Sequence, residues 1–323
     1  MADAIYFAEG ENIDFNPVAA HAAGEMVHLP DGRAAFAPTA IAAGVIGAVQ
    51  TTGIVLVTKT ADLVWVDGCE IYWDASANSA ILYPASDEDY LLGVAYGDAT
   101  AAATTGYVNL NVKPVYKIDL NRGGIADIFD SVIVKTVVGS TAVEVPHIKH
   151  MGCVNAFILG ATAEAQKIDL LSKQGFTVGS DWVVEGSFTV VDDGDAAAID
   201  FNIGVANGTH ATDANSITER CLLHTDANTV DILAWSTDGT TTVALTDTTV
   251  NYTLGTPVHF VIDGRNPADI QMYVNGALVL TAEVFKLDAA TGPLKLLAHI
   301  EKTADDETAD YRINYLRVRT MDL

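Results

Sequence analysis

The sequence predicts an all-β protein, and three observations support this. Most of the chain consists of short β-branched and aromatic runs, punctuated by Gly, Asp, Asn and Thr. Residues 269–280, DIQMYVNGALVL, are two alternating runs joined by Asn275-Gly276, a pair that favours a tight two-residue hairpin turn. Helical periodicity is scarce. Only TAEAQKIDLLSK, residues 162–173, spaces its apolar residues as a helix does, which predicts one short helix there.

The longest alternating runs follow residue 130. In AIDFNIGVA (198–206) the apolar residues face one way, and Asp200 and Asn202 face the other. The run DYRINYLRVRT (310–320) alternates up to Tyr315 and then slips by one residue, which predicts a β-bulge near Tyr315. About ten such runs predict two packed antiparallel sheets, a jelly-roll sandwich.

A change of texture divides the chain. Residues 1–116 are rich in Ala and Gly and hold short strands, whereas residues 130–323 hold the longer runs. Between them, residues 117–129 contain a Gly pair and are predicted to be a linker. The sequence therefore predicts a small β-rich domain followed by the sandwich.

The chain is strongly acidic, and the excess is spread along it. Its 323 residues carry 42 acids and 17 Lys and Arg, a formal net charge of −25. No basic stripe is available for phosphate backbones, so we expect no direct nucleic-acid binding. The acidity indicates a solvated, soluble surface, and a saline habitat would explain it equally well.

No apolar run approaches the roughly 20 residues of a membrane span, so we expect no membrane association. The acidic start lacks the features of a signal peptide, which predicts synthesis and use in the cytoplasm or release by lysis. Three cysteines in a chain of this size do not make a disulfide framework and suit a reducing compartment.

Signatures of catalysis are missing from the sequence. It has no phosphate loop, dinucleotide fingerprint, nucleophile elbow or H-E-x-x-H motif, so we expect no enzyme and no catalytic residue. A glycoside hydrolase would need two carboxylates flanking a sugar. The acidic segment EKTADDETAD (301–310) is instead interpreted as a solvated loop between two late strands.

Some residues could in principle hold a metal ion. Two groups with three-residue spacing stand out: His147, His150 and Cys153, and Cys221 and His224. Residues three apart on a strand point to opposite faces, so scattered histidines and buried thiols are expected instead. The acidic stretches 191–196 and 303–310 lack the spacing of a calcium loop. We therefore expect no metal and no cofactor.

A sugar-binding site is equally hard to place. Trp182 and Trp235 could form aromatic platforms, but a tryptophan on a sandwich strand is more often in the core. The carbohydrate-binding residues, if the chain has any, stay unknown at this point.

Four stretches of the N-terminal region carry a family resemblance. They are AAGEMVHLPDGRAAFA (22–37), IAAGVIGAVQ (41–50), DGCEIYWD (67–74) and LLGVAYGDATAAATTGYVNLNV (91–112). In this order they resemble the capsid cement, or head decoration, family of tailed bacteriophages. The resemblance implies a virion protein that binds the major capsid protein on the outer surface of the expanded head, as a homotrimer at three-fold sites.

Family members often use an N-terminal arm. Here Ile5, Tyr6 and Phe7 could add a strand to the edge of a capsid sheet, or they could form the first strand of their own domain. Residues 38–58 contain no ionisable side chain, which predicts either core or a subunit interface.

The C-terminal part resembles a concanavalin A-like, or laminin-G-like, sandwich. The resemblance rests on TPVHFVIDGRNPADIQMYVNGALVL (256–280) and ADYRINYLRVRT (309–320). Such domains bind sugars in some relatives and are inert surface modules in others. Two hypotheses follow: a capsid decoration protein that displays an outward lectin-like domain, or a carbohydrate-binding adhesin that acts through its sandwich.

Overall fold

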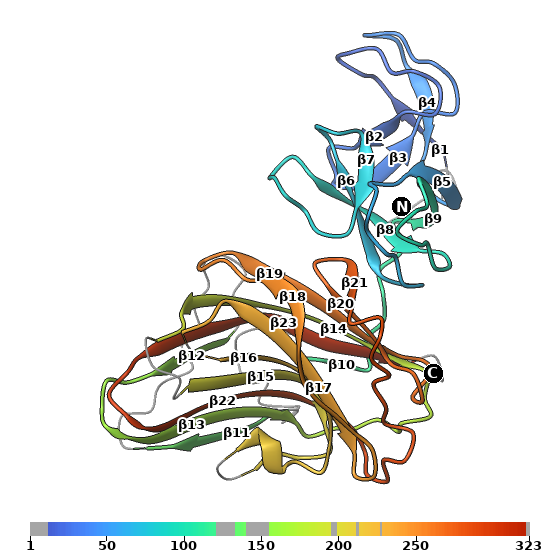
Figure 1. Ribbon diagram of the computed structural model, residues 1–323. Coiled ribbons are helices and arrows are strands. Elements are labelled where there is room, and N and C mark those ends of the chain that lie inside the picture. Colours follow the sequence, from blue (N-terminus) through green and yellow to red (C-terminus); the bar gives the residue numbers. More distant parts are fainter. Residues whose placement is uncertain are drawn as a thin grey trace, which may run out of the picture. The chain divides into compact units, whose positions relative to one another are not determined.

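The computed structural model describes residues 12–120, 133–139, 155–194, 199–210, 213–226 and 228–320. The chain divides into two compact units, Met1–Pro114 and Val115–Leu323. Both are built from antiparallel strands, and the single helical element of the described residues is a 3₁₀ turn, Ala214–Ser216 (Figure 1). The all-β prediction is confirmed. Within the described residues, no helix is long and apolar enough to cross a bilayer.

The N-terminal unit contains two small antiparallel sheets. The four-stranded sheet has the order β1-β4-β3-β2 and the five-stranded sheet the order β5-β9-β8-β6-β7. The strands of the first are β1 (Asn12–Phe15), β2 (Met26–His28), β3 (Ala34–Phe36) and β4 (Gly47–Gln50). Those of the second are β5 (Ile54–Thr58), β6 (Glu70–Asp74), β7 (Ser79–Ile81), β8 (Tyr90–Ala95) and β9 (Thr105–Leu110).

Trp65 lies at the centre of the core under the five-stranded sheet and is fully buried. Its ring lies against Gly106 on β9, where a Cβ atom would approach the indole to 2.2 Å. Glycine is therefore required at this position because any larger residue would displace the ring.

The side chain of Asn111 ties the two small sheets together. Its amide nitrogen donates to the carbonyl oxygens of Ala34, at 2.8 Å, and Thr51, at 2.6 Å. Its amide oxygen accepts from the backbone N–H of Ala34 at 2.9 Å. One side chain just after β9 thus satisfies three backbone groups at the ends of β3 and β4.

The C-terminal unit is a sandwich of two seven-stranded antiparallel sheets (Figure 1). The first sheet has the strand order β10-β23-β14-β19-β20-β21, and β12 also pairs with β23. The second sheet has the order β11-β13-β22-β15-β16-β17-β18. The first contains β10 (Ile118–Asp119), β12 (Asn155–Leu159), β14 (Trp182–Asp192), β19 (Pro257–Gly264), β20 (Gln271–Val274), β21 (Ala277–Val279) and β23 (Ala309–Thr320). The second contains β11 (Ile133–Val138), β13 (Glu164–Ser172), β15 (Ile199–Ala206), β16 (Glu219–Asp226), β17 (Asp231–Asp238), β18 (Thr242–Asn251) and β22 (Lys295–Asp305).

Both sheets contribute to one apolar core between them. Phe188 from the first sheet and Phe201 from the second meet there with ring centroids 5.3 Å apart. Phe201 also stacks on Tyr311 at 4.7 Å. Burying one such ring completely contributes about 2–3 kcal/mol to stability. The burial of these aromatic side chains therefore fixes which side of each strand points into the core.

Two local predictions are confirmed. Asn275 and Gly276 have φ values of 50° and 81°, and they form the tight turn that pairs β20 with β21. The register between β14 and β23 shifts at Asn314, because Ser187 faces Tyr315 and Phe188 faces Ile313. This is the bulge expected near Tyr315.

The helix predicted over residues 162–173 is wrong. Glu164–Ser172 is strand β13, which pairs with β11 on one side and β22 on the other. Ile168 and Leu170 lie in the sandwich core, while Lys167 and Asp169 are buried on the opposite face. A strand buried on both faces lacks a clean apolar alternation, and its two flanking strands override the modest helical propensity of the segment.

Candidate functional site

The second sheet of the sandwich turns one face to the core and carries three rows of side chains on its other face. Each row runs directly across β13, β22, β15 and β16 in cross-strand register. The apolar row is Leu171, Leu297, Gly204 and Leu222, continued by Trp235 on β17. The middle row is Asp169, His299, Asn202 and His224. The acidic row is Lys167, Glu301, Asp200 and Asp226.

Strand alternation produces this arrangement. Four strands each place polar residues two positions apart, so both project from the face opposite the apolar core. Because the strands pair without offset, the middle and acidic rows become continuous across the sheet. The polar side chains thus form a connected network.

His299 is the centre of the buried half of this network. It has no solvent exposure, and its Nδ1 lies 2.5 Å from a carboxylate oxygen of Asp169. Its Nε2 lies 2.9 Å from Glu301. The other oxygen of Asp169 lies 2.7 Å from the ammonium of Lys167, which also donates to the carbonyl of His210. Two carboxylates thus face two basic groups.

Electrostatics keep this group ionised. Burial by itself lowers the pKa of His299, but hydrogen bonds to Asp169 and Glu301 outweigh burial and raise it to about 9. Burial likewise acts to raise the pKa of Asp169, but its contacts with His299 and Lys167 bring it below the ordinary value. The raised pKa of His299 favours an imidazolium between the carboxylates of Asp169 and Glu301 at neutral pH.

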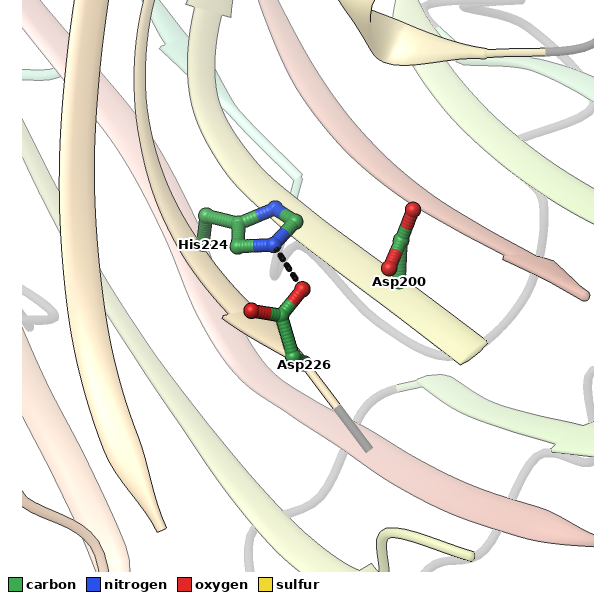
Figure 2. A group of neighbouring side chains, drawn as sticks. All are labelled: Asp200, His224 and Asp226. Carbon is green, nitrogen blue, oxygen red and sulfur yellow. Dashed lines mark hydrogen bonds and ion pairs between the residues drawn. The ribbon is translucent and has the colours of Figure 1, made fainter. Parts of the chain in front are cut away.

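The other half of the network is a trio of side chains of the types that can ligate a metal ion, Asp200, His224 and Asp226 (Figure 2). One ligand atom from each lies within 4.8 Å of the other two. His224 Nε2 is 2.6 Å from Asp226 Oδ1. Burial raises the pKa of Asp200 to about 6; His224 opposes this shift, and the Asp226 and Glu301 carboxylates add to it. The trio combines one imidazole with two carboxylates, a ligand set for a divalent cation.

The trio lies toward the accessible end of the face. His224 is 6% exposed and Asp226 39% exposed at the side chain. At the other end, Ala214 and Ile217 cover the apolar row around Trp235. Access from solvent is therefore through Asp226.

One of the candidate ligand pairs considered from the sequence is separated by the fold, as expected. Cys221 lies in the sandwich core and His224 on the opposite face of β16, as the three-residue spacing predicts. The other group, His147, His150 and Cys153, lies outside the described residues, and so does the predicted capsid-binding arm Ile5, Tyr6 and Phe7.

The acidic segment 301–310 is not a solvated loop throughout, so that interpretation is wrong for its ends. Glu301 lies within β22 and is buried against His299, because β22 extends to Asp305. Asp310 lies within β23 and pairs with Arg312. Both tryptophans considered as sugar platforms are buried. Trp182 lies in the core, and Trp235 lies under the Arg220 guanidinium at 4.1 Å.

The N-terminal unit shows a different kind of surface. Leu56 on β5, Tyr107 on β9 and Tyr96 just after β8 are neighbours across three strands on one face of the sheet. Their exposed fractions are 57%, 53% and 58%. Ile54, two residues before Leu56, lies on the same face and is 48% exposed. We name these four residues the apolar face.

Sequence reasoning missed the network because its members belong to distant segments. A signal was present in three strands, which read D-x-N at 200–202, H-x-D at 224–226 and H-x-E at 299–301 within apolar surroundings. Pairs of this kind on neighbouring strands indicate a polar row on the second face of a sheet.

Together these features define an all-β protein composed of a small two-sheet unit and a sandwich whose second sheet carries a polar network. Residues 7–110 match the family model of the phage cement protein. The N-terminal resemblance is thereby confirmed over these residues. No curated protein matches the chain.

Several solved structures resemble the sandwich part at low sequence identity. The carbohydrate recognition domain of Emp47p is 12% identical, with 58% of this chain and 88% of that chain covered and a TM-score of 0.42. The carbohydrate-binding module CBM66 from Bacillus subtilis is 11% identical, with 52% and 94% covered and a TM-score of 0.33. Alginate lyase A1-II′ is 13% identical, with 51% and 79% covered and a TM-score of 0.37.

Proposed function

We propose that the chain is a bacteriophage head decoration protein. It binds the major capsid protein on the outer surface of the expanded head, as a homotrimer at three-fold positions. The sandwich is displayed outward as a lectin-like module without catalytic activity. The observation that carries the proposal is the match of residues 7–110 to the phage cement protein family.

The physical basis of such a function is linkage. A ligand that binds only the expanded lattice stabilises that state by about 2.7 kcal/mol per site when its concentration is a hundred times its Kd. A trimer that contacts several capsid subunits adds avidity, so that no single contact has to be strong.

The apolar face supports self-association of the N-terminal unit. Copies of a chain with a net charge of −25 repel one another, so they can approach most closely where charge is missing. Ile54 and Leu56 belong to the uncharged stretch 38–58, and their side chains are exposed rather than in the core. We therefore assign the apolar face to contact with a second copy in the trimer.

For the N-terminal arm both hypotheses stand as proposals. Ile5, Tyr6 and Phe7 either add a strand to a capsid sheet edge or pair within their own domain. Deleting residues 1–8 distinguishes the two hypotheses. Loss of capsid binding with an unchanged unfolding midpoint supports the strand added to a capsid sheet. A lowered unfolding midpoint supports pairing within the chain's own domain.

Co-sedimentation tests the proposal. The purified full chain is mixed with expanded and unexpanded heads of the phage whose genome encodes it, and the pellets are imaged by cryo-electron microscopy. We expect saturable binding to expanded heads only, with density at three-fold positions. Failure to bind either form would contradict the proposal and favour the adhesin hypothesis, which a glycan array then tests.

A further inference from the structure

The trio of Asp200, His224 and Asp226 has a geometry that the proposed function does not use. Asp200 lies on β15, directly opposite Asp226 on the paired strand β16. His224 lies two residues before Asp226 and so projects from the same face. All three side chains converge in Figure 2 because two strands hold them in register rather than a flexible loop.

His224 is oriented by a neighbour in the way that metal-binding histidines are. Its Nδ1 lies 2.9 Å from the amide oxygen of Asn202, an acceptor that suits a protonated Nδ1. Nε2, on the other side of the ring, points at Asp226. A hydrogen bond that fixes the tautomer and presents the other nitrogen is a recurring outer-shell arrangement in metal sites.

The contact between His224 and Asp226 is close, with Nε2 and Oδ1 2.6 Å apart. Asp200 adds a second carboxylate beside them. The side chain of His224 is 6% exposed and points into this site, where a cation bound between the imidazole and the two carboxylates would offset the cost of burying them.

We propose that Asp200, His224 and Asp226 bind a divalent transition-metal cation of the Zn²⁺ class. The three residues supply one nitrogen and two oxygen ligands, and the partly exposed side of Asp226 provides the entry path and the remaining coordination position. This inference goes beyond the decoration function and does not depend on it.

The spacing of the ligand atoms fits such an ion. Bonds of about 2.0–2.2 Å from one ion place neighbouring ligand atoms about 3–4 Å apart. The three ligand atoms already lie within 4.8 Å of one another, and the 2.6 Å contact between His224 and Asp226 must open. Rotation of the partly exposed Asp226 side chain is sufficient for this small change.

The ligand types favour Zn²⁺ over Ca²⁺. Calcium takes six to eight oxygen ligands, usually from loops, whereas imidazole suits Zn²⁺ and other later transition metals. A site with one buried imidazole and two carboxylates in regular strands has too few oxygens for Ca²⁺ and enough ligands for a Zn²⁺ ion that keeps a water molecule.

The test uses the untagged full chain, freed of metal with a chelator. Zn²⁺ is titrated into it by calorimetry, and Co²⁺ is titrated separately to follow visible absorption. We expect one Zn²⁺ bound per chain, a Co²⁺ spectrum of low coordination number, and an unfolding midpoint raised by about 5 °C at saturating Zn²⁺. No binding of either ion would overturn the proposal.

Matched variants locate the ion. Asp226→Asn is nearly isosteric at a partly exposed position, so the fold is retained, and we expect at least tenfold weaker Zn²⁺ binding and loss of the Co²⁺ absorption. Asp306→Asn, in a separate acidic group with Asp305 and Glu307, is the control and should bind as the unmodified chain does. Equal binding by Asp226→Asn and the unmodified chain would place the ion elsewhere and overturn the assignment.

Discussion

In the N-terminal unit the histidine–carboxylate pair of His21 and Glu25 lies near the surface, with side chains 20% and 41% exposed. In the sandwich, His299 lies between Asp169 and Glu301 with no exposure at all. The N-terminal unit also has exposed apolar side chains that are direct neighbours, since Leu56 and Tyr107 lie side by side on its sheet.

This difference indicates a division of roles. A surface that leaves neighbouring apolar residues uncovered is suited to association, because burying them against a partner is favourable. A sheet that encloses paired charges gains little net stability from them and loses much when one partner is removed. Substitutions on the surface of the N-terminal unit are therefore expected to change association. Substitutions within the second sheet of the sandwich are expected to change stability.

The largest effect is expected from removing the buried imidazole. His299→Leu leaves Asp169 and Glu301 without their shared partner, so the free energy of unfolding of the sandwich should fall by about 3–5 kcal/mol. Urea denaturation of the full chain, followed by tryptophan fluorescence, measures it. His21→Leu in the exposed pair is the matched control and should cost less than about 1 kcal/mol. Equal losses in the free energy of unfolding for His299→Leu and His21→Leu would contradict the proposed difference between the two units.

The same residue predicts a pH dependence. The pKa of His299 is raised from 6.5 to about 9, because its two carboxylate contacts outweigh burial. A raised folded-state pKa adds stability that is fully present below pH 6.5 and is lost as the pH rises toward 9. Each pKa unit corresponds to about 1.4 kcal/mol, so the sandwich should lose about 3 kcal/mol over this interval.

Urea midpoints at pH 6.5 and pH 9, measured with a chelator present, test this dependence. His299→Gln removes the titrating group, so its midpoint should change much less than that of the unmodified chain. An equal change in midpoint between pH 6.5 and pH 9 for the two chains would show that another group is responsible for the pH dependence.

Much of the fold follows from local patterns, but the network does not. The hairpin at Asn275-Gly276 and the bulge near Tyr315 are encoded by turn chemistry and by a slip in alternation, each within about ten residues. The contact between Asp169 and His299 joins residues 130 positions apart. It depends on the register of β13 against β22, which no local pattern reveals.

The mistaken helix has the same cause. Residues 164–172 carry good helix formers, and only their place between β11 and β22 makes them a strand. Once the segment is a strand, Lys167 and Asp169 fall on one face and join the network. A sequence interpretation that places this segment in a helix therefore also misses the buried ion pairs of Asp169 with Lys167 and His299.

The N-terminal unit has a smaller internal weak point in Asn111. Asn111→Ala removes three hydrogen bonds to backbone groups of Ala34 and Thr51, which should lower the stability of this unit by about 2 kcal/mol. Both Asn111 and Asn78 have positive φ, at 58° and 51°, so Asn78→Ala controls for backbone strain. Asn78 lies in an exposed turn, and the excess loss in Asn111→Ala measures the hydrogen bonds. Equal losses would show that strain alone accounts for the effect.

The smallest effect on stability, and the most specific for function, is expected at the apolar face. Leu56→Ser and Leu278→Ser each replace an exposed leucine, 57% and 37% exposed, in the first unit and the sandwich respectively. Both should change the free energy of unfolding by less than about 0.5 kcal/mol, since neither vacates a packed core. Sedimentation equilibrium should nevertheless show weaker self-association for Leu56→Ser alone, because only Leu56 lies beside Tyr107 on the surface assigned to a second copy. If Leu278→Ser weakens association instead, the copies meet through the sandwich, and the apolar face is left to contact the capsid.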